Sequence, residues 1–270
     1  MRKTSQFLGA ALFAVFALSS CTKEVKEQTQ DEPISENVLA QIKAHGFGTS
    51  DVQRVEDGYL VEGDILLTPE YLNRAADGKL LRIANVEQYH TTNLVKALPR
   101  VITVAMDSRL TSKAGYSQGL DEMIRRYNAE NLQITFQRVS SGANVTFTNA
   151  TGSYLASAGF PTAGGDPFNS VKVNSRAIGT GTSTTFINYL ATILAHEAGH
   201  CIGFRHTDYM NRAYSCGGTA TNEGASTVGA IHIPGTPTTA DAGSWMLACI
   251  GTNGNRPFNA NDKTALNYLY

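Results

Sequence analysis

Three histidines and a glutamate occur close together in this chain, at the spacing of a zinc site. His196 and His200 are four residues apart, so on an α-helix both imidazoles leave the same face and can reach one metal ion. Glu197 lies beside them and is not expected to bind the metal. Its chemistry suits a general base that takes a proton from the water activated by the metal and passes it to the leaving amine.

Two further residues extend this pattern beyond the helix. Gly203 follows His200 by three residues, where a chain that leaves a helix sharply needs a residue free to adopt positive φ. The turn would bring His206 back as the third ligand. Three neutral imidazoles leave one tetrahedral position open for water, which is typical of a catalytic zinc site. The alternative, histidines that only cap a hydrophobic core, does not account for the register of Gly203 and His206.

The pattern H-E-x-x-H-x-x-G-x-x-H over residues 196–206 resembles the metzincin zinc peptidases. Ser244-Trp245-Met246 resembles the methionine turn of that family, which implies that Met246 forms a hydrophobic floor beneath the zinc. The residues of the motif, with Asp208 shortly after the third histidine, most resemble those of the bacterial lipoproteins known as dual-action HEIGH metallopeptidases. The resemblance covers roughly residues 95–270 and implies a Zn²⁺-dependent endopeptidase that acts on proteins or peptides.

A second hypothesis is a surface lipoprotein that binds protein or glycan and keeps zinc only to hold its fold. Glu197 argues against this hypothesis, because a structural zinc site needs no carboxylate beside its ligands.

The first residues of the chain indicate export. Arg2 and Lys3 precede an apolar run at 7–18 that is too short for a comfortable membrane span, so residues 1–20 are expected to be a signal peptide. Leu18-Ser19-Ser20-Cys21 resembles a bacterial lipobox, which implies lipidation of Cys21; ordinary secretion with an incidental cysteine is the alternative. Residues 21–33 are polar and charged, as expected of a tether. We therefore expect a protein anchored by lipid in the bacterial cell envelope.

Charge and cysteine content narrow the class further. The 270-residue chain has a net charge of −1 and no basic stripe with interleaved aromatic residues, so nucleic acid is not an expected partner, and we expect a monomer. In an oxidising compartment Cys201, Cys216 and Cys249 can form one intramolecular disulfide. The sequence favours Cys216 with Cys249, because Cys201 lies within the zinc helix, where a buried thiol packs as a small hydrophobic group.

Residues 34–95 are expected to form a separate, propeptide-like region. Within it Tyr59-Leu-Val-Glu-Gly-Asp-Ile65 resembles the short Phe-x-Gly-Asp segment of astacin propeptides, although Val61 replaces the phenylalanine. The resemblance implies that Asp64 occupies the open position of the zinc and keeps the enzyme latent. A solvated turn between two strands is the alternative. Under the latency hypothesis a cut between about residues 64 and 100 activates the enzyme, with Arg82, Lys96 and Arg100 as exposed candidate sites.

Residues 96–270 are expected to form an α+β, metzincin-like catalytic domain. We expect a twisted mixed sheet, a backing helix with an apolar stripe around Leu120 and Tyr127, the zinc helix from Ser183 or Thr184 onward, and an irregular C-terminal part. Strands are predicted at 101–106, 134–139 and 145–147, and a C-terminal helix at 261–270. The resemblance further implies a substrate-pairing edge strand within 152–164, for which a plain surface loop is the alternative, and a pocket wall at 231–237. His232 is expected to be structural or to line the pocket wall, with metal ligation as the alternative.

Overall fold

The computed structural model describes residues 33–74, 88–219, 230–237 and 239–270. Residues 34–270 form one compact unit. Cys21, the expected signal peptide, the tether up to Glu32 and Arg82 lie outside the described residues. Within the described part of the chain, no helix is long and apolar enough to cross a membrane.

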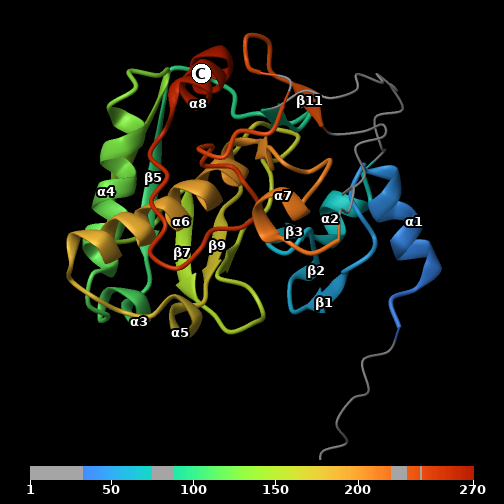
Figure 1. Cartoon of the computed structure of the whole chain (residues 1–270), viewed down its shortest axis with the longest axis horizontal. Helices are drawn as coiled ribbons and strands as arrows, with labels where there is room; N and C mark the ends of the chain where they lie inside the picture. The colour runs from blue at the N-terminus through green and yellow to red at the C-terminus, as the bar shows by residue number, and fades with distance from the viewer. Residues whose placement is uncertain (1–32, 75–87, 220–229, 238) are drawn as a thin grey trace, which may run out of the picture. The chain divides into compact units, whose positions relative to one another are not determined.

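A five-stranded mixed sheet forms the centre of the catalytic part (Figure 1). Its strand order is β6-β5-β7-β9-β8, in which β8 alone runs antiparallel to its neighbour, at one edge. The predicted mixed sheet is therefore confirmed. The strands are β5 (Arg100–Met106), β6 (Ile134–Arg138), β7 (Val145–Asn149), β8 (Ala156–Ser157) and β9 (Ser170–Val173).

Two long helices, α4 (Tyr116–Asn128) and α6 (Thr184–Ile202), pack against each other and on this sheet. The predicted stripe on α4 is buried: Leu120, Met123 and Tyr127 are all inaccessible to solvent. The chain therefore has the backing helix and the long helix carrying His196 and His200 that the sequence predicted. Short helices α3 (Ser108–Thr111) and α5 (Ser175–Ile178) precede α4 and α6 respectively.

Local sequence determines where α6 begins and ends. The Ser183 hydroxyl accepts a hydrogen bond from the Phe186 amide at 3.2 Å, which caps the first turn. Gly203 ends the helix with φ of 112°, and a Cβ there would lie 2.9 Å from the Asn93 carbonyl oxygen. Glycine is required because both the positive φ and the close approach exclude a side chain.

The N-terminal region has its own small core. It contains a three-stranded antiparallel sheet, and its apolar cluster includes Ile42, Phe47 and Tyr71, together with Phe160 from the catalytic part. The elements are α1 (Glu36–Ala44), β1 (Gln53–Val55), β2 (Gly58–Val61), β3 (Ile65–Leu67) and α2 (Pro69–Leu72). The boundary at residue 95 between this region and the catalytic domain stays a prediction.

The remaining elements lie around the end of α6. Strand β4 (Tyr89–His90) is the middle of a second three-stranded sheet, between β10 (Phe204–Arg205) and β11 (Ile231–His232). The irregular C-terminal part contains α7 (Ala213–Cys216) and ends with α8 (Ala260–Leu269), close to the predicted helix. A disulfide joins Cys216 to Cys249, as the sequence favoured, and Cys201 is a buried free thiol.

Candidate metal centre

The three predicted histidine ligands converge on one point. One donor atom from each of His196, His200 and His206 lies within 4.8 Å of the others and of a carboxylate oxygen of Asp64. The Nε2 atoms of His196 and His200 are 3.1 Å apart. His196 and His200 come from one face of α6, and His206 returns to them after the turn at Gly203, as the spacing predicted.

Backbone carbonyls orient two of the rings. His196 Nδ1 lies 2.9 Å from the Trp245 carbonyl oxygen, and His200 Nδ1 lies 2.8 Å from that of Phe204. Because a carbonyl oxygen only accepts, each Nδ1 must carry the proton and donate it. The Nε2 atoms that face the shared point therefore have free lone pairs, which is the tautomer that a metal ligand needs.

The electrostatics of the cluster also suit ligation. Burial, with the adjacent His196 and His206, lowers the pKa of His200 well below its ordinary value, so its ring is neutral and able to bind a cation. Burial alone would raise the pKa of Asp64. Interactions with the adjacent His206 and His196 outweigh burial and hold this pKa below its usual range. Asp64 is therefore ionised beside the three rings.

Asp64 lies at this point because the chain turns sharply between β2 and β3. Glu62 and Gly63 have φ of 52° and 87°, and a Cβ on Gly63 would lie 2.1 Å from a guanidinium nitrogen of Arg212. Asp64 then places its two oxygens 3.1 Å from His206 Nε2 and 3.4 Å from His196 Nε2. The segment is a turn between two strands, but it is buried rather than solvated, since Asp64 is only 9% exposed.

Glu197 lines the same cavity as Asp64 and His196. Its side chain is buried, and its Oε2 atom has no hydrogen-bond partner among the described residues. Burial, and then the charge of Asp64, raise the pKa of Glu197 well above its ordinary value. A buried carboxylate oxygen without a partner is costly for a fold, and a catalytic role is one explanation for such a group.

Met246 packs against the zinc helix at the level of the histidines. It is fully buried, and a Cβ placed on Gly199 would lie 2.6 Å from its sulfur atom. The adjacent Trp245 donates its indole N–H to the Ala195 carbonyl oxygen at 3.3 Å. The predicted methionine turn therefore lies against α6, where only glycine at position 199 leaves room for it.

Asp208, which follows the third histidine of the motif, has a positioning role that the sequence did not indicate. Its Oδ1 accepts a hydrogen bond from the Ala248 amide at 2.9 Å, and its Oδ2 accepts one from the Ser215 hydroxyl at 2.5 Å. These bonds tie the segment after His206 to the residues that follow Met246 and to helix α7. An acidic residue just after the third histidine was the signal that could have indicated this role.

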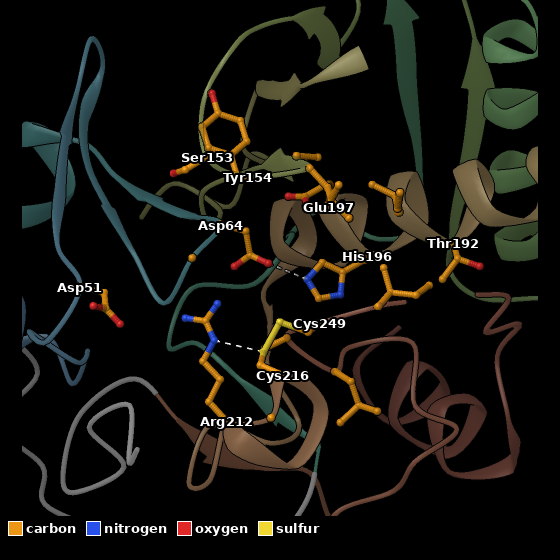
Figure 2. Close-up of a pocket in the computed structure, with 18 of the residues that line it drawn as sticks. Asp51, Asp64, Ser153, Tyr154, Thr192, His196, Glu197, Arg212, Cys216 and Cys249 are labelled. Atoms are coloured by element: carbon orange, nitrogen blue, oxygen red, sulfur yellow. Dashed lines mark hydrogen bonds and ion pairs between the residues drawn. A yellow bond between two sulfur atoms is a disulfide. The ribbon is translucent and has the colours of Figure 1, made fainter. Parts of the chain in front are cut away.

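A cavity of about 650 Å³ opens beside His196 and Glu197 (Figure 2). Residues 153–156, next to and within the edge strand β8, line one side of it, which agrees with the expected substrate edge within 152–164. None of residues 231–237 lines this cavity, and Ile231 and His232 pair with β4, so the expected pocket wall at 231–237 stays a prediction. The opposite wall consists instead of Ile193 and Thr192 from α6, Leu247 to Ile250, Arg212, Arg256 and the disulfide.

His232 and Cys201 are not part of the metal cluster. His232 Nε2 lies 3.1 Å from the Thr236 hydroxyl, in keeping with the structural role expected from the sequence. Cys201 is buried on α6, and the described cluster of donor atoms does not include it.

Comparison with known proteins yields one family. The model of the dual-action HEIGH metallopeptidases matches residues 60–270. Among solved structures, one of myroilysin is similar, with 17% sequence identity and a TM-score of 0.41, over 66% of this chain and 96% of that one. A search of curated proteins found no match.

Proposed function

Because the chain belongs to the dual-action HEIGH metallopeptidase family, we propose that it is a zinc endopeptidase of the metzincin type. The observation that carries the proposal is the convergence of His196, His200 and His206 with a buried carboxylate beside them. Three nitrogen donors and one oxygen donor form a set that zinc binds in tetrahedral geometry, and the orienting carbonyls are the partners that ligating histidines have. The residues present therefore fit the metal.

Bound zinc would supply a Lewis acid that lowers the pKa of water and polarises the scissile carbonyl. Glu197 has the position and the raised pKa of a group that accepts a proton from the attacking water and returns it to the leaving amine. The cavity beside Glu197 and Ile193 would hold a substrate side chain next to the scissile bond. Met246 would support the histidines from below as an apolar floor.

Asp64 would keep the intact chain latent. Its carboxylate competes for the position that the attacking water needs. The neighbouring backbone supports this role, because the Ala158 amide donates to the Asp64 carbonyl oxygen at 3.0 Å and the Leu66 amide donates to that of Ala158 at 2.8 Å. Ile65 thus forms a single parallel bridge with Ala158, next to the edge strand β8, where an extended substrate would bind.

Fewer basic residues are candidates for an activating cut than the sequence suggested. Arg100 begins β5, is half-buried and pairs with Asp166 at 2.7 Å, so it is not the exposed site that was expected. Lys96 is exposed, and Arg82 lies outside the described residues.

We also propose that a lipid on Cys21 anchors the protein. Metabolic labelling with a radioactive fatty acid tests this proposal, because the wild-type protein should be labelled and Cys21→Ser should not.

The experiment that tests the function compares two proteins: the Asp64→Ala chain, in which latency should be removed, and the same chain with Glu197→Gln added. Both proteins should bind about one zinc per chain. Hydrolysis of casein or gelatin should fall about 10²–10⁴-fold with Glu197→Gln, because general acid–base catalysis is lost while the ligands remain. Equal activity in both proteins, or activity in neither, would defeat the peptidase proposal and favour a binding lipoprotein with structural zinc.

A further inference from the structure

A buried ion pair next to the metal centre has no part in the proposed catalysis. Arg205 is completely buried on β10, and one of its terminal nitrogens lies 2.7 and 3.0 Å from the two carboxylate oxygens of Glu62. The partners are 143 residues apart in the chain. Burying two charges is costly and is retained only where the geometry of the pair is good.

The N-terminal region provides several of the groups that contact the Arg205 guanidinium. The Gly46 carbonyl oxygen accepts from its other terminal nitrogen at 3.1 Å, and the Phe47 ring centre lies 4.3 Å from its central carbon. The catalytic part adds the Tyr209 ring at 5.7 Å. Glu62 is the one carboxylate paired with Arg205 among the described residues. If residues 34–74 leave the cleft, Arg205 remains as a cation that has lost its anion.

The position of Glu62 relates this pair to the metal centre. Its Oε2 atom lies 4.0 Å from His206 Nδ1, whereas Asp64 contacts Nε2 on the other side of the same ring. A single stretch of three residues thus gives one carboxylate to the metal centre and another to Arg205. A peptide bound in place of this stretch would meet both features at a similar separation.

We propose that Arg205 binds the carboxylate of a substrate side chain in a subsite that Glu62 fills in the intact chain. The proposal rests on the peptidase function proposed above and names a substrate class for it: peptides with a glutamate or aspartate at one position near the scissile bond. Arginine suits this role because its planar guanidinium binds a carboxylate through charged hydrogen bonds. The subsite is separate from the cavity beside Ile193, whose lining does not include Arg205.

The test uses the full chain with Asp64→Ala, combined with Glu62→Gln to release Arg205 from its anion. Peptides of eight residues, amidated at the C-terminus so that only side chains are acidic, carry Glu or Gln at each position in turn. With Arg205 present, Glu should be preferred over Gln at one position by at least about tenfold in kcat/KM. Adding Arg205→Met should reduce this preference for Glu over Gln in kcat/KM below about twofold.

Two features keep the outcome interpretable. The chain with both Glu62→Gln and Arg205→Met has no unpaired buried charge, so it should fold, which thermal unfolding checks. Arg138→Met, on the edge strand β6, is the matched control and should keep the preference. The proposed subsite would be overturned if kcat/KM were equal for Glu and Gln peptides with Arg205 present, or if the preference for Glu survived Arg205→Met.

Failure of the peptidase proposal would give a different result. If no peptide is cleaved by any of these chains, the peptidase function fails, and calorimetric titration of the Glu and Gln peptides into the Asp64→Ala, Glu62→Gln chain tests the subsite alone. Binding of the Glu peptide at least about tenfold more tightly, lost with Arg205→Met, would support it. Equal binding of both peptides would overturn it.

Discussion

Two stretches of this chain each bring a carboxylate to the same centre, and they do so by different means. Glu197 is part of the 19-residue helix α6, whereas Asp64 is held on a turn between two short strands. Burial raises the pKa of Glu197, while the neighbouring histidines keep that of Asp64 low. The environment therefore suits one carboxyl to proton transfer and the other to ligation, although the two side chains have similar chemistry.

The two stretches also differ in how they are anchored. Helix α6 is embedded in the main core, which includes Leu190 and Leu194. The Asp64 turn lies in the N-terminal region, whose contacts with the rest of the chain include Phe160, the bridge at Ala158 and two ion pairs, Glu62–Arg205 and Asp57–Lys172. The N-terminal stretch could therefore be withdrawn while the main core stays packed, whereas α6 could not.

The largest expected effect comes from the ligand that α6 does not carry. His206→Ala should abolish peptide hydrolysis and lower zinc content, because two imidazoles remain where catalysis needs three protein ligands. Zinc per chain, measured by plasma emission spectroscopy after dialysis, checks this directly. His232→Ala should keep its zinc, since His232 pairs with Thr236 away from the centre. If His206→Ala binds zinc as well as the parent, this is a two-histidine site of another kind.

The second effect tests whether the N-terminal stretch guards the metal. Asp64→Ala should make the uncut, full-length chain at least about tenfold more active than the parent. This factor corresponds to a loss of about 1.4 kcal/mol from the free energy that favours the state in which the N-terminal stretch blocks the site. The rate of peptide hydrolysis is measured while gel electrophoresis shows that the chain is intact.

Asp57→Ala is the matched control for Asp64→Ala. It removes an acidic residue of the same region that pairs with Lys172 at 2.9 Å, partly exposed, so latency should be unchanged. If Asp64→Ala stays as inactive as the intact parent, while the trimmed forms of both are active, Asp64 does not guard the zinc.

The sequence was informative about α6 because every relation there is local. The spacing of His196, His200 and His206, the cap at Ser183 and the turn at Gly203 all follow from helix geometry within a short stretch. The apolar stripe of α4 and the central strands were predicted for the same reason. Periodicity reports which face of an element is buried.

Relations between distant residues could not be read in this way. No periodicity or spacing links Glu62 to Arg205, and Asp208 acquires its role only when the Ala248 amide and Ser215 come beside it. The pairing of Ile231 and His232 with β4 was likewise not predicted, because it depends on strand contacts across the fold. The turn at Glu62–Asp64 was expected as one of two alternatives, and only its burial distinguishes them.

The smallest expected effect concerns the floor beneath the histidines. Met246→Leu should fold and keep most of its activity and zinc, because the exchange conserves volume and an apolar surface at a cost below about 1.5 kcal/mol. Thermal unfolding and zinc content measure the two parts of this expectation. The adjacent glycine makes the contrast sharp: Gly199→Ala would place a Cβ 2.6 Å from the Met246 sulfur, so it should destabilise the protein more than Met246→Leu does. Loss of zinc in Met246→Leu would mean that the sulfur atom itself, rather than packing, supports the site.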